Sequence, residues 1–308
     1  MGKQKPLLTG ASDWCGPKPN DPSPIVYHGG VDGKGAAQLI AGGQPNFCLS
    51  YYAIGKNGTG LKDHPSMDPK TMGRRFLDSG AFSFLSSAAN ADAINVDEYL
   101  NRYVTWVKSA PIPLDFYVTF DYKIRSALIY EITADLNKRG IKPTVVYHGD
   151  AGIDWLKKYI DLGHKFICLS KRNFLLNKTG LLKFYDQAFN LGEKHNVRFH
   201  GLACGIGAEI WDYPWWSVDA STIARTANLG GLLLLRPSTM RAHTLSIAAN
   251  SPYASKTGPE IMKYATEWGL SLSELQTDSY KRIFFNAKMV GEVQKLRKAK
   301  KWTNKSLF

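Results

Sequence analysis

The stretch Trp215-Trp-Ser-Val-Asp-Ala-Ser-Thr222 indicates how this chain is built. Its apolar run, Trp215 to Val218, has the length of a short buried strand and ends on an acid, Asp219. Ser221 and Thr222 follow, and hydroxyl side chains there suit the first turn of a helix. The stretch therefore predicts a strand that carries one carboxylate to its C-terminal tip. The alternative is that Asp219 only caps the helix that follows.

Two further apolar stretches end in the same way. Arg74-Arg-Phe-Leu-Asp78 is followed by Ser79 and a glycine, and Phe116-Tyr-Val-Thr-Phe-Asp121 ends on a third acid. The three stretches are far enough apart in the chain for crossover helices. In a parallel β/α architecture all such strand ends open on one face. Since an acid at a buried strand end is costly unless it is paired or used, we expect the three acids to share one site.

The order of predicted elements favours one large α/β barrel. Apolar strand-like runs alternate with helical patterns at a spacing that suits βαβ units, and about eight such strands follow residue 45. This count predicts a TIM-type (β/α)8 barrel, and no GxGxxG motif supports a dinucleotide-binding domain. The predicted strands are residues 47–54, 74–78, 115–120, 143–148, 165–170, 197–202, 215–218 and 230–235.

We expect three parts in the 308-residue chain. Residues 1–44 form an irregular N-terminal arm, which contains a possible short strand at 25–28. Residues 45–250 form the barrel, and residues 251–308 form a C-terminal helical extension with a basic tail. The long apolar runs are too short to span a bilayer, and the N-terminus lacks the apolar core of a signal peptide, so the expected location is the cytoplasm.

Charge indicates a polyanionic partner. The chain has 39 Lys and Arg against 26 Asp and Glu, a formal net charge of +13. Nucleic acid is the simplest such partner, and a generally basic enzyme is the alternative. The densest basic cluster lies in the tail, where an aromatic ring that could stack on a base stands among the cations; a solvated C-terminus is the alternative reading. The tail residues assigned to nucleic acid are Arg297, Lys298, Lys300, Lys301 and Trp302.

The four cysteines stand singly, which argues against a zinc knuckle. We expect no bound metal and no cofactor. Cys48, Cys168 and Cys204 lie in apolar runs and are expected to act as small core residues.

The motifs together resemble those of the tRNA-guanine transglycosylases. Asp78-Ser-Gly-Ala-Phe-Ser is similar to the Asp-Ser-Gly-Gly-Phe-Gln signature of that family, and Thr119-Phe-Asp121 is similar to its base-recognising segment. His200-Gly-Leu-Ala-Cys-Gly205 stands where the family has a glycine-rich strand end. The Ser-Val-Asp-x-Ser-Thr form around Asp219 looks closer to the DNA-acting branch, the 7-deazaguanine DNA transglycosylases of phages and genomic islands. The resemblance covers roughly residues 45–235.

The resemblance implies a role for each acid. Asp219 would be the nucleophile that attacks C1′ of a nucleotide, and Asp78 the general acid/base for the leaving and incoming bases. Asp121 would bind the base edge. The other residues implied to contact substrate are Ser79, Phe82, His148, Lys171, His200, Gly201, Ser221, Thr222 and Arg225.

Several of these residues have a second interpretation. His148 could be a satisfied strand-end histidine, and His200 could contact substrate, orient Asp219 or pack in the core. Arg225 could hold a phosphate or pair with an acid. Phe82 could stack on the base or belong to the core.

The chain departs from the family in two places. The usual zinc site, three cysteines and a histidine after the nucleophile strand, is missing, which puts tRNA specificity in doubt. The Gly-Gly turn that contacts the base is replaced by Ser170-Lys171-Arg172.

The expected function is exchange of guanine in DNA for a 7-deazaguanine base through a covalent aspartyl intermediate, with DNA and the free base as partners. The alternatives are exchange in tRNA, a nucleoside or glycoside hydrolase that activates water, and a non-catalytic nucleic-acid-binding barrel. A homodimer stays open.

Overall fold

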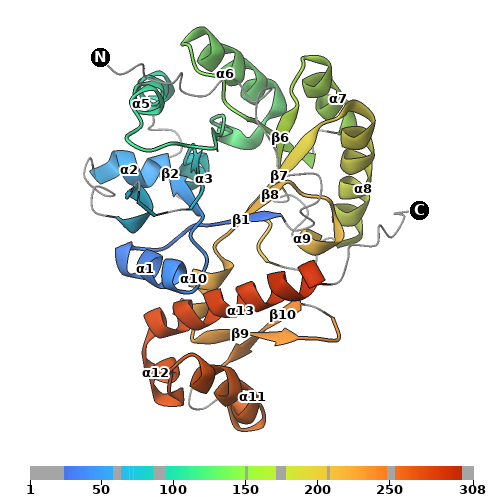
Figure 1. The fold of residues 1–308 in the computed structure, drawn as a ribbon. Helices are drawn as coiled ribbons and strands as arrows, with labels where there is room; N and C mark the ends of the chain where they lie inside the picture. The colour runs from blue at the N-terminus through green and yellow to red at the C-terminus, as the bar shows by residue number, and fades with distance from the viewer. Residues whose placement is uncertain are drawn as a thin grey trace.

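The computed structural model describes residues 24–57, 64–68, 70–71, 73–85, 95–149, 152–170, 178–206, 209–239, 241–247 and 254–299. Within them, eight parallel strands form one sheet in the order β4-β3-β2-β1-β8-β7-β6-β5, with helices around it (Figure 1). The barrel strands are β1 (Ile25–His28), β2 (Phe47–Ser50), β3 (Arg75–Asp78), β4 (Phe116–Tyr117), β5 (Val145–His148), β6 (Phe166–Ser170), β7 (Arg198–Leu202) and β8 (Ser217–Ala220).

The sheet closes between its two outer strands, β4 and β5. Val118 and Thr144 form a parallel bridge just beyond β4 and just before β5. The Thr119 N–H donates to the Thr144 carbonyl at 2.9 Å, and the Thr144 N–H donates to the Tyr117 carbonyl at 2.8 Å. Because these bonds join the strands that would otherwise be free edges, the predicted (β/α)8 barrel is confirmed.

Side chains alternate between the inside of the barrel and the layer between strands and helices. The inner cluster holds rings and thiols rather than aliphatic side chains alone; its members are Tyr27, Phe76, Phe116, Val118, Val146, Phe166, Cys168 and Trp216, with Ile25, Cys48 and Leu202 packed against it. Val26, Phe47, Leu77 and Leu169 belong to the larger outer cluster. Side chains therefore fill the barrel interior, so a ligand could bind only at one of the two ends of the barrel.

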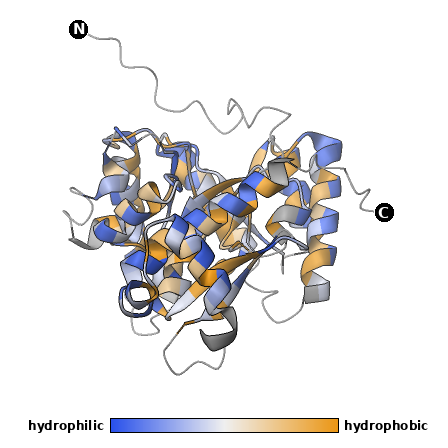
Figure 2. Cartoon of the chain, turned by 60° about the horizontal axis from the view of Figure 1, so that its bottom comes forward, coloured by the Kyte–Doolittle hydropathy of each residue, from blue (hydrophilic) through white to orange (hydrophobic). Residues whose placement is uncertain are grey.

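The helices that surround the barrel are α1 (Gly33–Ala41), α2 (Tyr51–Asn57), α3 (Ala81–Leu85), α5 (Val96–Lys108), α6 (Ser126–Lys138), α7 (Ile153–Asp161), α8 (Lys178–His195), α9 (Glu209–Asp212) and α10 (Thr222–Asn228). Two 3-10 turns, η2 (Pro65–Met67) and η3 (Tyr122–Ile124), also occur. Along the helices, hydrophobic and hydrophilic residues interchange as in amphipathic helices (Figure 2).

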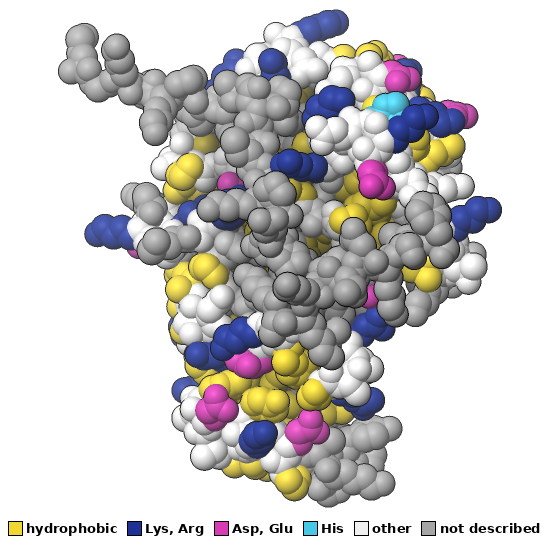
Figure 3. Space-filling model, turned by 45° about the vertical axis from the view of Figure 1, so that its right-hand side comes forward, with side chains coloured by type: hydrophobic (Ala, Val, Ile, Leu, Met, Phe, Trp, Pro, Cys, Tyr) yellow, Lys and Arg dark blue, Asp and Glu magenta, His cyan; other side chains and the backbone are white. Residues whose placement is uncertain are grey.

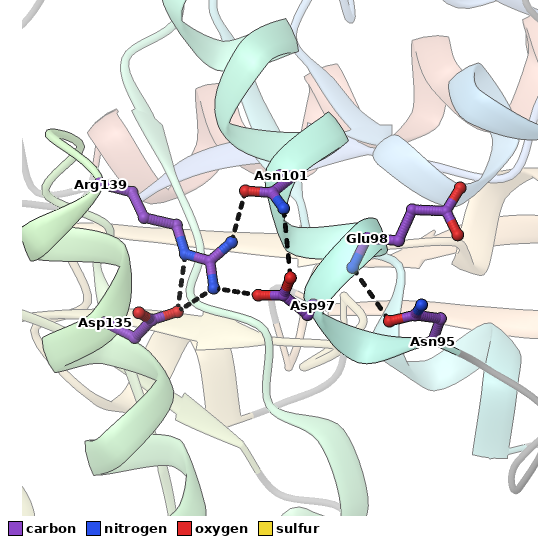
Figure 4. A network of polar contacts seen from close by, with 6 residues as sticks. All are labelled: Asn95, Asp97, Glu98, Asn101, Asp135 and Arg139. Atoms are coloured by element: carbon purple, nitrogen blue, oxygen red, sulfur yellow. Dashed lines mark hydrogen bonds and ion pairs between the residues drawn. The ribbon is translucent and has the colours of Figure 1, made fainter.

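Polar contacts fix two neighbouring outer helices, α5 and α6. Asn95 caps α5 by accepting from the Glu98 N–H at 3.2 Å. The Arg139 guanidinium lies between the helices and donates to Asp135 at 2.8 Å and to Asn101 at 2.6 Å, and it also pairs with Asp97 (Figure 4). These contacts lie on the outer ring, so their role is structural.

The first predicted boundary, at residue 45, is wrong. β1 lies between β2 and β8 in the sheet, and its residues pair with β8 from Ile25 to His28. The buried pattern of β1 explains its place, because Val26, Tyr27 and His28 are all nearly inaccessible. α1 also packs against the barrel, so residues 25–41 belong to it.

The last predicted barrel strand, at residues 230–235, lies outside the barrel. It is β9 (Gly231–Arg236), which pairs antiparallel with β10 (Arg241–Ser246), a strand that the sequence pattern did not reveal. The Leu233 N–H donates to Asn286 Oδ1 at 2.7 Å, and the Leu235 N–H donates to the Met289 sulfur at 3.2 Å. These side chains come from the last helix, so β9 belongs with the C-terminal helices and the predicted boundary at 250 is too late.

The C-terminal helices are α11 (Ala254–Glu267), α12 (Leu272–Thr277) and α13 (Ser279–Ala299), as predicted in kind. α13 crosses the molecule between the barrel helices α1 and α10 and the β9–β10 hairpin (Figure 1). Its buried Arg282 donates to the Ala227 carbonyl at 2.6 Å and to the Leu275 carbonyl at 2.9 Å. One side chain thus supplies hydrogen bonds to carbonyl groups near the ends of α10 and α12, and it links the barrel to the C-terminal helices.

The predicted strand at 47–54 ends early, at Ser50. Residues from Tyr51 form α2, and the Tyr51 ring packs edge-on against Tyr99 and Tyr103 of α5. Tyr52 packs against Phe84 in the same way. Aromatic packing against α5 and α3 therefore overrides the strand preference of this apolar run.

Candidate active site at the C-terminal end of the barrel

The three predicted acids lie at one end of the barrel. Asp78 is the last residue of β3, Asp121 follows the short strand β4, and Asp219 is the third residue of β8. Asp219 is therefore part of its strand, and Ser221 occupies the position that precedes α10. The alternative that Asp219 caps the helix is wrong. We call Asp78, Asp121 and Asp219 the acidic trio.

The carboxyl of Asp78 is held in an environment that disfavours its charge. Burial raises its pKa, and the neighbouring carboxylates of Asp121 and Asp219 raise it further. Hydrogen bonds from the backbone N–H groups of Ser79 and Gly80 act in the opposite direction. The resulting pKa is about 7, compared with an ordinary value of 3.8, so this carboxyl exchanges a proton near neutral pH.

A tight turn after β3 holds Asp78 in place. Gly80 has φ +80°, and a Cβ there would come within 2.5 Å of the Tyr52 Cβ. The Gly80 N–H donates to Asp78 Oδ2 at 2.8 Å. Ser79 is fully buried, and its carbonyl accepts from the Tyr99 hydroxyl at 2.6 Å. Glycine is thus required at position 80 both for its backbone conformation and for space.

One oxygen of Asp219 lies against two polar neighbours. The Ala203 N–H donates to Oδ1 at 2.8 Å, and His200 Nε2 lies 3.3 Å from the same atom. Ala203 has φ +51°, a left-handed conformation that is unfavourable for alanine, and the turn that contains it puts this N–H on the carboxylate. In the part of the chain that the structure describes, no hydrogen bond reaches Oδ2 of Asp219.

His200 contacts Asp219 from inside the barrel. It is fully buried, and its Nδ1 lies 2.7 Å from the Ser217 hydroxyl. Burial lowers the pKa of His200, so the ring is neutral and carries one N–H. If that hydrogen is on Nε2, it donates to Asp219 while Nδ1 accepts from Ser217. Rings of Phe76 and Phe116 lie edge-on about the imidazole, 4.8 and 5.0 Å away between centroids.

Asp121 forms a second acid–histidine pair. His148, the last residue of β5, is nearly inaccessible, and its Nε2 lies 3.1 Å from Asp121 Oδ2. Its Nδ1 is buried and has no hydrogen-bond partner among the described residues. The turn beyond Asp121 is strained, since Lys123 and Ile124 have φ of +59° and +52°. His148 is therefore satisfied on one nitrogen and open on the other.

Two thiols lie beneath the acidic trio. Cys48 of β2 and Cys168 of β6 belong to the inner cluster, and burial raises the pKa of both, with the charges of Asp219 and Asp78 acting in the same direction. The thiols stay protonated, so they form an uncharged floor for the site. The prediction of small core residues is confirmed for Cys168 and Cys204, which are buried.

The sequence did not single out His28 or Ser217. His28 ends β1 as His148 ends β5, and its Nε2 lies 3.2 Å from Gln44 Oε1. Burial lowers the pKa of His28 to about 4, although Gln44 and the charge of Asp219 raise it, so the ring is neutral. The available signal for Ser217 was its spacing, because a residue two positions before Asp219 faces the same side of the strand.

The other predicted site residues separate into two groups. Thr222 lies by the turn that holds Asp219, since a Cβ at Gly205 would come within 3.2 Å of its hydroxyl, and Ser221 lies beside Gly30. Arg225 is exposed on α10. Phe82 is 62% exposed, so the core alternative for it is wrong. Gly201 faces the packing layer rather than the acids.

The space beside Gly201 is already filled. A Cβ there would lie 2.5 Å from the Cys204 sulfur and 3.1 Å from Trp215 and Val218 atoms. Packing therefore explains this glycine. Lys171, Lys300, Lys301 and Trp302 lie outside the described residues, and of Arg297 and Lys298 only the helical backbone in α13 is described.

The described residues include no group of three or more His, Cys, Asp or Glu side chains placed to hold a metal ion. None of the helices described is long and apolar enough to cross a bilayer. Lys and Arg side chains are spread over the surface seen in Figure 3, with Asp and Glu between them. The site consists of carboxylates, imidazoles, thiols and backbone donors.

Comparison with known proteins finds a likeness of shape but no family. No model of a known protein family matches the chain, and no curated protein matches it. A solved structure named as a putative fructose-1,6-biphosphate aldolase from Coccidioides immitis aligns over 89% of this chain and 91% of its own, with 10% identity and a TM-score of 0.45. At these values the likeness carries no inference about activity. The barrel assignment rests on the closed parallel sheet.

Proposed function

We propose that this protein exchanges guanine in DNA for a 7-deazaguanine base through a covalent glycosyl–aspartate intermediate. The observation that carries the proposal is the acidic trio. Its members share one end of the barrel, one carboxyl has a pKa of about 7, and another keeps an oxygen free of hydrogen bonds from the described residues. The motif resemblance and the net charge of +13 support a nucleic-acid substrate over a small neutral glycoside.

In the first half-reaction, Oδ2 of Asp219 attacks C1′ of a deoxyguanosine. The C1′–N9 bond breaks as the new C1′–O bond forms, and the protonated Asp78 carboxyl gives its proton to the departing guanine. Displacement at a sugar carbon passes through an oxocarbenium-like state, which the Asp219 carboxylate stabilises. The Ala203 N–H and His200 contact Oδ1 of Asp219, so Oδ2 is the oxygen that attacks C1′ of the sugar.

In the second half-reaction, the 7-deazaguanine takes the place of guanine. The Asp78 carboxylate accepts the proton from N9 of the new base while N9 attacks C1′ and Asp219 leaves. A carboxyl with a pKa of about 7 suits both directions, because its two protonation states are comparably populated at neutral pH. To Asp121, whose Oδ2 lies 3.1 Å from His148 Nε2, we assign acceptance of N–H bonds from the base edge.

A labelled-base assay tests this function. The protein is incubated with radiolabelled guanine or a labelled 7-deazaguanine and with either duplex DNA or tRNA. We expect label in DNA with the wild-type protein and none with Asp219→Asn. Label in tRNA alone would replace the DNA substrate by tRNA. Guanine released from the DNA without incorporation of label would identify a hydrolase. If the protein neither incorporates label nor releases guanine, it would be a non-catalytic binding protein.

A further inference from the structure

We propose that one face of the β9–β10 hairpin binds the phosphodiester backbone of the nucleic acid. Arg236, Arg241 and His243 lie on this side of the hairpin beside the buried Leu234, and we call these three residues the basic hairpin face. Arg236 and Arg241 are directly opposite in the antiparallel register, so their side chains project from the same side. His243 lies two residues further along β10 and therefore shares that side.

The charges on this face oppose one another. Two arginines opposite each other repel. Partial burial lowers the pKa of His243, and the charges of Arg236 and Arg241 lower it further. Among the described residues, the ion pairs of this face involve one acid, Asp212, which accepts from Arg241 at 2.8 Å. Arg236 is exposed and is left without an acid in the described part of the chain. An added anion would relieve the repulsion.

The face also has side-chain nitrogens that no described residue contacts by a hydrogen bond. Arg241 Nε and His243 Nε2 are buried atoms without a hydrogen-bond partner. The Arg241 side chain is 38% exposed, so an anion can reach its guanidinium head. Guanidinium groups match phosphate oxygens in geometry and keep their charge at all relevant pH values. A phosphate group at the exposed guanidinium heads of Arg236 and Arg241 supplies the negative charge that this face lacks.

The position of the face favours a polymer over a free phosphate. Asp212, which anchors Arg241, belongs to α9 in the β7–β8 connection, and the same connection contains Ala203, which holds Asp219. Figure 1 shows α9 between the barrel strands and the hairpin. A strand of DNA whose backbone lies on the hairpin therefore runs beside the segment that borders the proposed nucleophile. The identity of the polymer as DNA rests on the proposed function.

The salt dependence of DNA binding tests the inference. Fluorescence anisotropy gives the Kd of the full-length protein for a labelled duplex DNA at several salt concentrations. The test variant is Arg236→Gln/Arg241→Gln. The matched control is Arg102→Gln/Lys157→Gln, which removes two exposed cations that pair with acids on the outer helices α5 and α7.

We expect the test variant to bind about tenfold more weakly and its slope of log Kd against log salt to fall by about 1.8, because each phosphate contact contributes about 0.9 to that slope. The control should keep the wild-type slope. Arg236→Gln alone changes an exposed side chain, so this variant should fold. Its slope of log Kd against log salt should fall by about 0.9. Equal slopes in the test and control variants would overturn the inference.

The labelled-base assay separates this inference from the proposed function. If the wild-type protein exchanges no base but the test and control variants differ in salt slope, the exchange activity is refuted and the basic hairpin face is supported. Base exchange without a slope difference would refute the face alone.

Discussion

Both ends of the barrel contain half-buried acids, but the groups around these acids differ. At the N-terminal end, Asp115 accepts from the Tyr27 hydroxyl at 2.5 Å and lies 3.9 Å from an Arg74 nitrogen. At the C-terminal end, Asp78 has backbone N–H donors and faces two other carboxylates. Burial raises the pKa of both acids, but Tyr27 and Arg74 lower that of Asp115 whereas Asp121 and Asp219 raise that of Asp78.

Under the proposed function, this difference separates a structural acid, Asp115, from a reactive one, Asp78. A partner that stabilises the charged form makes Asp115 part of the barrel's packing. Neighbours that destabilise the charged form keep Asp78 ready to exchange protons, at a cost to stability. Four predictions test this difference, by substitutions near each acid and by changes in pH.

The largest expected effect is loss of base exchange in Asp219→Asn. Removing the attacking carboxylate should reduce exchange by about 1,000-fold or more, since nucleophile deletions in enzymes reach this size. Asp115→Asn, the matched change at the other end, should exchange base within about threefold of wild type and lose about 1 kcal/mol of stability. Label incorporation and urea unfolding measure the two effects. Comparable activity losses in both variants would erase the distinction between the ends.

Asp78→Asn should lower exchange and raise stability. The amide keeps its acceptor for the Gly80 N–H but cannot transfer the proton, so exchange should fall by about 100- to 10,000-fold. The folded-state pKa of Asp78 is raised to about 7, so its contribution to stability decreases as pH rises from about 4 to about 7. The variant should therefore gain on the order of 2–4 kcal/mol at pH 8. Urea unfolding at pH 5 and pH 8 measures this, and a variant less stable than wild type at pH 8 would contradict the account.

Guanine release should depend on the protonated form of Asp78. With a pKa of about 7, the acid form falls tenfold for each pH unit above that value. The single-turnover rate of guanine release from DNA should therefore decrease between pH 7 and pH 9. A rate that stays constant to pH 9 would mean that another group protonates the base.

A smaller effect should follow from Gly80→Ala, compared with Gly43→Ala. Both glycines have a positive φ, +80° and +83°, but only the Cβ at position 80 meets Tyr52; at position 43 it meets nothing within 4 Å. We expect a loss of roughly 2–5 kcal/mol at position 80 and about 1 kcal/mol at position 43. Exchange should suffer only at position 80, because that turn carries Asp78. Equal losses in thermal unfolding would remove the steric argument.

The sequence predicted the strand-end acids because their pattern is local. An apolar run that ends on an acid can be recognised from the sequence alone. The alternation of strands and helices then predicts that Asp78, Asp121 and Asp219 lie at the same end of the barrel. The barrel was predicted correctly but one strand was assigned wrongly at each side. β1 is only four residues long and β9 is strongly apolar, and pairing partners, which decide membership, are far away in the chain.

The contacts that tune the site could not be predicted. The hydrogen bond from the left-handed Ala203 to Asp219 joins residues sixteen positions apart. The pKa of Asp78 depends on its burial and on two acids from distant parts of the chain. Phe82 shows the same limit, since its aromatic character did not reveal that it is exposed. Such properties arise from the closed barrel rather than from any one stretch.

The most direct test of the central claim is mass spectrometry of the protein denatured during turnover with duplex DNA. The account predicts a covalent DNA adduct on the peptide that contains Asp219, formed by the wild-type protein and absent from Asp219→Asn. An adduct on a peptide without Asp219, or base exchange that proceeds with no adduct under trapping conditions, would contradict it.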